Sequence, residues 1–343
     1  MKLGYSPALD GLRAVAILTV MAFHAGVPFL PGANLGVDLF FVLSGYLVGR
    51  LLLAEYEANG RIVVKAFYKR RLWRLLPALV ALLVMYLLLA PFLWPDYWFH
   101  LRDALAVLLY VPDIALMFGH GPHYLLHSWS LGVEERFYLL APWLLLGALV
   151  CFRRRYLWCG VVVLLLGVWV WEWYCLASYR TEHYYRFDIR VSGLLVGMLL
   201  ASLGRLQLTP SVKMGGWLAF GLTSLWLTLL AISTPQAWRL GVGGLAVEMG
   251  AMVAIVWVVS QPDGVLAQAL SGRAWVYIGK ISYGLYLFHY PVMQYLKMHV
   301  SWPWVWLLGS LIALILAVIS WHFLEQPINN WRKNRYSMQP LAQ

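Results

Sequence analysis

The sequence predicts an all-α integral membrane protein, a polytopic bundle of about ten transmembrane helices with both termini in the cytoplasm. Of its 343 residues, 62% are hydrophobic and only 12% are charged, which is about half the charge of an average soluble domain. The apolar residues also form long uninterrupted runs. Only helices and closed barrels satisfy their own backbone in lipid, and continuous runs favour helices.

Apolar windows of about 17 to 22 residues are the candidate spans. There are about eleven, at 7–27, 36–54, 75–93, 102–118, 128–149, 156–175, 188–204, 213–232, 241–260, 275–297 and 303–323. No cleavable signal peptide is evident, so the window 7–27 is predicted to be a retained first span. The connections are short and predict one compact bundle.

Basic loops predict the orientation, because short cytoplasmic loops are rich in Lys and Arg. The most basic loop, RIVVKAFYKRRLWR at 61–74, and the arginines at 153–155 should both be cytoplasmic. Two segments on the same side of the membrane must be separated by an even number of spans, but three windows lie between these two. The weakest, 102–118, carries Arg102, Asp103, Pro112 and Asp113, so we expect it to lie on the outer face or dip into it. Ten spans then remain.

The net charge of +11 is concentrated in these short loops. It therefore indicates membrane topology and contact with anionic lipid head groups, and does not indicate nucleic-acid binding. Cys151, Cys159 and Cys175 have no close pair spacing and predict neither a metal site nor a disulfide framework.

Ionisable side chains inside spans are costly in lipid and are therefore candidate functional groups. One set falls in the outer half of the predicted membrane: His24, Asp38, Ser44, Ser130, Glu134, Arg186, Asp188, Arg190 and His289. Ser130 and Glu134 share a helical face by their i, i+4 spacing. A histidine with a carboxylate is the minimum set for general-base catalysis, although each residue could instead make a structural hydrogen bond.

A second set lies near the cytoplasmic ends of the first and third spans: Arg13, Arg71 and Arg74. Arginine forks suit phosphate, whereas anchoring by the positive-inside rule is the alternative. Arg13 and His24 are eleven residues apart, a helical rise of about 16 Å. A donor with an anionic head and a long thin arm, such as a coenzyme A thioester, could span that distance.

Seven segments together resemble the membrane acyltransferase family three, the O-antigen acetylase type. In order, they are LDGLRAVAILTVMAFHAG, GVDLFFVLSGYL, FYKRRLWRLLPAL, HSWSLGVEERFYLLAPW, RFDIRVSGLLVG, GKISYGLYLFHYPV and FLEQPI. The resemblance covers nearly the whole chain. It implies a membrane acyltransferase domain at 1–330, followed by a short basic cytoplasmic tail at 331–343.

The resemblance also assigns residues to the family's motifs. The arginine–histidine motif falls on Arg13 and His24, the paired-arginine motif on Arg71 and Arg74, and the serine–glutamate motif on Ser130 and Glu134. The late motifs fall on Ser282, Tyr283, Tyr286, His289, Glu325 and Pro327. We expect His24, Glu134, Ser130, Asp38 and His289 to be catalytic, and Arg13, Arg71, Arg74, Tyr283 and Tyr286 to bind the donor.

The activity expected from the resemblance is transfer of an acyl group, usually acetyl, from cytoplasmic acyl-CoA to a hydroxyl of an envelope glycan or its lipid-linked precursor. His24 would be the base, and Glu134 would orient it or stabilise its cation, with no permanently bound cofactor or metal. An acyl-histidine or acyl-serine intermediate stays possible. Some family members carry a fused extracytoplasmic esterase-like domain, and here we expect any such partner to be a separate chain or absent.

Other readings are a secondary transporter with a buried ionisable pathway, acylation of a small-molecule hydroxyl, or a structural protein of envelope assembly. No inverted repeat of the polar motifs, which would be typical of a transporter, is visible. The motif set favours the enzyme. The expected location is the bacterial cytoplasmic membrane.

Overall fold

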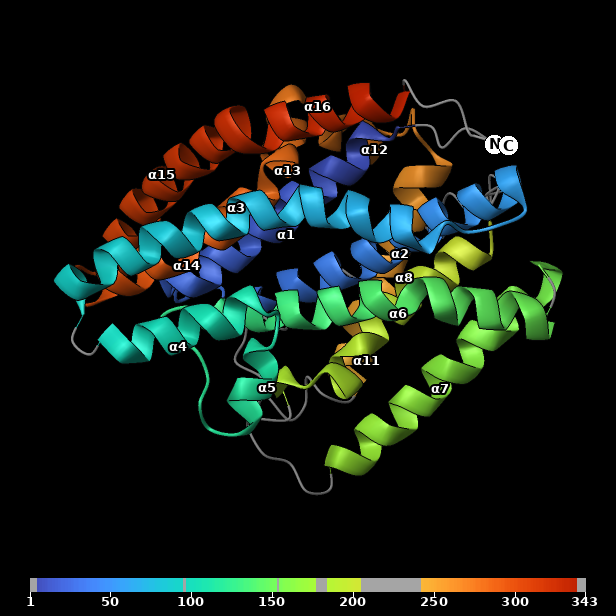
Figure 1. The fold of residues 1–343 in the computed structure, drawn as a ribbon, viewed down its shortest axis with the longest axis horizontal. Helices are drawn as coiled ribbons and strands as arrows, with labels where there is room; N and C mark the ends of the chain where they lie inside the picture. The colour runs from blue at the N-terminus through green and yellow to red at the C-terminus, as the bar shows by residue number, and fades with distance from the viewer. Residues whose placement is uncertain (1–4, 95–96, 153, 177–183, 205–241, 338–343) are drawn as a thin grey trace.

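Helices account for all the regular secondary structure in the part of the chain that the structure describes, which is residues 5–94, 97–152, 154–176, 184–204 and 242–337 of a computed structural model (Figure 1). The predicted span 213–232 and Arg153, which was predicted to be cytoplasmic, lie outside these ranges.

The principal helices follow one another with short connections. Their bounds are α1 Pro7–Ala25, α2 Gly36–Asn59, α3 Val64–Leu93, α4 Tyr97–Leu108, α5 Pro112–Met117, α6 Trp129–Phe152, α7 Leu157–Leu176, α8 Phe187–Ser202, α11 Val242–Ser260, α12 Val265–Leu270, α13 Arg273–Lys280, α14 Ser282–Lys297, α15 Trp302–Ser320 and α16 Gln326–Ser337.

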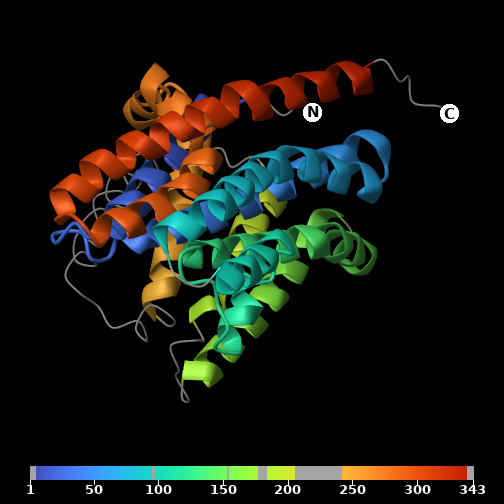
Figure 2. The same cartoon turned by 60° about the vertical axis from the view of Figure 1, so that its left-hand side comes forward.

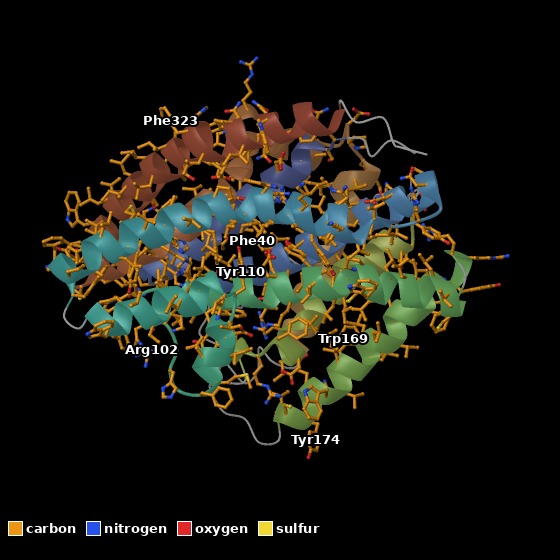
Figure 3. The ribbon with its side chains drawn as sticks, viewed as in Figure 1. Phe40, Arg102, Tyr110, Trp169, Tyr174 and Phe323 are labelled. Carbon is orange, nitrogen blue, oxygen red and sulfur yellow. The ribbon has the colours of Figure 1, made fainter. Side chains whose placement is uncertain are left out.

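Six helical segments in the described ranges are long and apolar enough to cross a membrane: 7–25, 33–59, 64–93, 126–152, 154–176 and 302–331. The apolar windows of the first two are 61% buried inside the protein, whereas that of the last is only 22% buried. Helices α1 and α2 therefore lie at the centre, and α15 presents most of its apolar surface outward. Phe323, at the upper edge of Figure 3, is 75% exposed, as expected for a side chain that faces lipid.

Helices α1 and α2 form an antiparallel hairpin. Pro7 occupies the first turn of α1, where its missing N–H costs no hydrogen bond, and Gly26 ends the helix in the left-handed region at φ 79°. The short connection from α2 to α3 then places the start of α3 at the same end of the bundle as the start of α1. We call this end of the bundle the arginine end, because Arg13, Arg71 and Arg74 lie within the first turns of α1 and α3.

Helix α2 also packs closely against α8. A Cβ atom at Gly45 would lie 1.9 Å from the carbonyl oxygen of Leu194, and one at Gly197 would lie 2.1 Å from that of Val42. Small residues let helix backbones approach each other in this way, which is the usual packing device inside membranes.

The predicted window 102–118 is not a single helix. It contains parts of two short helices, α4 and α5, separated at Tyr110 (φ 55°). Neither helix is long enough to cross a membrane, in agreement with the prediction.

The window 275–297 was predicted to be one span, and this prediction is wrong. Helix α13 ends at Lys280 and α14 begins at Ser282. Helix α13 instead packs on the start of α1, where a Cβ at Gly279 would lie 1.9 Å from the carbonyl oxygen of Asp10.

The last span continues beyond the membrane length. Helix α15 passes through a π-helical turn, Trp321–Glu325, into α16, and Figure 2 shows the two helices as one long rod along the outside. The π-turn leaves Glu325 buried, with Ser320 donating a hydrogen bond to it over 3.1 Å. The predicted tail at 331–343 begins inside α16.

Candidate functional site

A cavity lies between α1, α2, α3, α6 and α14, with about 690 Å³ of empty space that includes the solvent at its opening. Its lining residues are Arg13, Val37, Phe40, Phe41, Ser44, Leu47, Arg71, Arg74, Leu75, Ser130, Leu131, Glu134, Tyr138, Ser282, Tyr283 and Tyr286. Phe40 is labelled near the centre of Figure 3, between α3 and α6. Segments far apart in sequence thus contribute to one site, and most of the predicted site residues are among them.

Three arginines line the cavity at the arginine end. Arg13 pairs with Asp10 over 3.3 Å, and the guanidinium of Arg71 lies 4.4 Å from the ring centroid of Tyr138. Within the described residues, neither Arg71 nor Arg74 has a carboxylate within ion-pair distance. Arg74 is also exposed, so the cavity opens to the surface beside it. The cavity therefore carries excess positive charge at its entrance.

Glu134 is the carboxylate that lines the cavity. Ser44 donates a hydrogen bond to its Oε1 over 2.9 Å, and Tyr138 donates one to its Oε2 over 3.3 Å. These contacts join α2 to α6. Among the described residues, the hydrogen-bond partners of Glu134 are thus hydroxyl groups on the cavity wall, and the predicted contact with His24 is not among them.

The deep wall of the cavity is formed by Ser130 and Tyr286, both buried. The Tyr286 hydroxyl lies 2.5 Å from the carbonyl oxygen of His127 and 2.6 Å from Oγ of Ser130. A carbonyl only accepts, so Tyr286 donates to His127 and Ser130 donates to Tyr286. The Ser130 proton is thus engaged with a phenol rather than with a base.

Behind this wall lies a group of histidine and tyrosine rings. The ring centroid of Tyr286 is 5.6 Å from that of His289, and Nε2 of His289 is 2.9 Å from Nδ1 of His24. His24 also meets Tyr290 edge to face, with the centroids 4.8 Å apart. His24 and His289 do not line the cavity, but Tyr286 contributes to both the cavity wall and the ring group.

His127 belongs to the same group and was not singled out in the sequence. Its buried ring stacks on Tyr290 with centroids 4.8 Å apart, and it lies 5.5 Å from the ring of His289. Its place three residues before Ser130, at the start of the motif HSWSLGVEE, was the available signal. Tyr138, which contacts both Arg71 and Glu134, was also missed.

Several predicted polar residues lie elsewhere. Asp38 forms a buried ion pair with Arg190 of α8 over 2.5 Å and does not line the cavity. Arg186 and Asp188 pair with each other at the start of α8. The contact between Asp38 and Arg190 joins α2 to α8, and Asp38 lies outside the cavity lining.

The fold and the site define a multi-pass membrane protein with a cationic cavity that ends beside a pair of histidines. Residues 6–322 match the family model described as an acyltransferase domain. The chain therefore belongs to this acyltransferase family, and the resemblance drawn from its motifs is confirmed.

Curated relatives share about a third of the aligned residues. The chain is 32% identical over 357 residues to the peptidoglycan O-acetyltransferase OatA of Listeria monocytogenes, covering 97% of this chain and 56% of that protein. It is 31% identical over 350 residues to the O-acetyltransferase OatA of Staphylococcus aureus, covering 94% and 57%. The chain thus spans a little over half the length of these relatives. No solved structure matches it.

Proposed function

We propose that the chain is a membrane-embedded O-acyltransferase that moves an acetyl group from cytoplasmic acetyl-CoA to a hydroxyl of an envelope glycan or its lipid-linked precursor. It would cross the bacterial inner membrane ten times with both termini inside. Residues 1–330 would form the catalytic domain. The single observation that carries this proposal is the cavity that opens beside unpaired arginines and ends one side chain away from a histidine pair.

The donor would enter at the arginine end. Arg13, Arg71 and Arg74 would bind the phosphates of coenzyme A, since guanidinium forks match phosphate oxygens and, among the described residues, Arg71 and Arg74 form no ion pair. Tyr283 and Tyr286 line the same cavity from α14 and would contact the pantetheine arm. The long, narrow shape of that arm suits a site whose charge lies at one end and whose base lies at the other.

The thioester would then react at the histidine end. His24 takes the proton from the acceptor hydroxyl, and the oxygen attacks the thioester carbonyl carbon. A C–O bond forms, the C–S bond breaks, and the imidazolium of His24 returns the proton to the departing thiolate. For this, the acyl group must pass Ser130 and Tyr286, which lie between the cavity and the rings.

The remaining predicted residues support this path. Glu134 offsets part of the positive charge of Arg71 and, through Ser44 and Tyr138, holds the cavity wall between α2 and α6. Ser130 holds Tyr286 at the deep end. Asp38, bound to Arg190, fixes α2 against α8.

The acceptor proposal rests on the relatives. The Listeria monocytogenes relative is named for peptidoglycan, so a hydroxyl on a sugar of the cell envelope is the acceptor we propose. A separate extracytoplasmic protein would be a further partner. Acylation of a small-molecule hydroxyl would use the same site and differ only in the acceptor.

The test uses inverted membrane vesicles from cells that express the chain, supplied with acetyl-CoA that carries label in its acetyl group. We expect base-labile label on glycan, absent from vesicles without the protein. Label that accumulates inside the vesicles without covalent attachment would instead identify a transporter. Label on a small molecule alone would reject the glycan acceptor.

A further inference from the structure

The hydrogen bond between His24 and His289 has a direction that the surrounding atoms determine. Helix α14 places Nδ1 of His289 2.7 Å from the carbonyl oxygen of Tyr286 and 3.0 Å from that of Leu285. Carbonyl oxygens only accept, so Nδ1 of His289 carries its proton and donates to them. In a neutral ring the other nitrogen, Nε2, is then bare.

The burial of His289 favours its neutral form. Its side chain has 0% exposure, and none of its hydrogen-bond contacts in the described residues is to a carboxylate. An unpaired cation in such a place is costly, because nothing replaces its hydration. Nε2 of His289 is therefore an acceptor, and Nδ1 of His24, which lies 2.9 Å away, must be the donor.

The tautomer of His24 follows from this. With its proton on Nδ1, the lone pair of His24 lies on Nε2, the nitrogen that points away from His289. The position of that ring is further limited by Tyr290 and Phe23, whose ring centroids lie 4.8 Å and 5.3 Å from it, both edge to face. His24 is also partly exposed, while His289 is fully buried.

We infer that His289 is a positioning residue that fixes His24 in the Nδ1-protonated tautomer and aims its Nε2 lone pair at the acceptor hydroxyl. The inference rests on the proposed function of His24 as base. In many hydrolases a carboxylate orients the catalytic histidine. Here a second, neutral imidazole holds that place, itself fixed by two backbone carbonyls of its own helix.

A matched pair of substitutions tests this. His289→Gln keeps an acceptor oxygen near the position of Nε2, so transfer should fall by no more than about tenfold. His289→Leu removes the acceptor, and kcat should fall by about 100-fold or more, because His24 then adopts both tautomers and several ring positions. The KM for acetyl-CoA should stay unchanged in both variants, since neither changes the arginine end. Equal rates for the Leu variant and the wild type would overturn the inference.

The double variant separates positioning from a purely structural effect. If His289 acts through His24, adding His289→Leu to His24→Ala should cause no further loss of residual transfer. A full additional 100-fold loss in the double variant would reject the inference.

A measurement without activity covers the case in which the Leu variant does not fold. The nitrogen NMR spectrum of wild-type protein labelled in histidine, with His24→Ala used for assignment, should show His24 protonated at Nδ1 and bare at Nε2. The opposite tautomer would overturn the inference even if acetyl transfer is observed. A fully active His24→Ala protein would instead reject the proposed function of His24 as base, and this result is distinguishable from the wrong tautomer.

Discussion

Nδ1 of His24 lies 2.9 Å from Nε2 of His289, although 265 positions separate the two residues in the chain. The contact joins the end of α1 to the middle of α14. Tyr286, one turn before His289, lines the cationic cavity. The pair of His24 and His289 therefore lies one side chain away from that cavity.

Removing one cavity arginine should weaken donor binding. Charge-assisted contacts contribute about 1.5–3 kcal/mol, so Arg71→Ala should raise the KM for acetyl-CoA about ten- to hundredfold. The measurement is initial-rate kinetics with varied donor. The matched control is Lys65→Ala, which removes a charge from an exposed position of α3 outside the cavity. A donor KM that is the same in Arg71→Ala and wild type would contradict the phosphate role.

The substitution Glu134→Gln tests whether Glu134 only supports the cavity wall or also assists His24 as base. The amide oxygen can still accept from Ser44, but the negative charge near Arg71 is lost. We expect a lower donor KM and a kcat within about threefold of wild type, because the kinetic effect of a uniform binding change appears in KM. A fall in kcat of about 100-fold with constant KM would restore Glu134 as the residue that assists His24.

The contact between α2 and α8 predicts a stability effect away from the site. Gly45→Ala would place its Cβ against the Leu194 carbonyl, and overpacking of this kind costs about 1–3 kcal/mol. The melting temperature in detergent should fall by several degrees. Gly147→Ala in α6 is the control, because nothing lies within 4 Å of its Cβ. Equal melting temperatures for the two variants would show that α2 and α8 do not approach so closely.

Asp103 of α4, outside the six long apolar helices, predicts a pH dependence of stability. Burial raises the pKa of Asp103 to about 6 from 3.8. The folded protein then holds this proton over a range where the unfolded chain releases it, so stability falls as pH rises from about 4 to 6. Asp103→Asn should remove that part of the fall. Melting curves of the two proteins that shift in parallel from pH 4 to pH 7 would contradict this.

The sequence predicted the class of fold and many of the residues that line the cavity, but it did not predict the contacts between side chains of different helices. Hydropathy and basic loops predicted the membrane helices, and helical spacing placed Ser130 and Glu134 on one face. Which side chains meet across helices depends on packing that no periodicity encodes. The sequence therefore did not predict that Glu134 accepts hydrogen bonds from Ser44 and Tyr138, or that Asp38 pairs with Arg190.

The break at Lys280 escaped prediction for a similar reason. The window 275–297 is apolar enough to be predicted as one span. In the structure, α13 ends before α14 begins, and Gly279 of α13 packs against the backbone of Asp10 in α1. Helix α14 begins at the cavity and reaches His289 two turns later, which places His289 next to His24.

The most direct measurement of the central claim compares His24→Ala with wild type for acetyl transfer and, separately, for acetyl-CoA binding. Loss of a general base predicts a transfer rate lower by on the order of 10² to 10⁴. Acetyl-CoA affinity should be unchanged, because Arg13 lies about 16 Å away from His24 along α1, and Arg71 and Arg74 line the same arginine end from α3. A folded His24→Ala protein that transfers acetyl at the wild-type rate would contradict the claim.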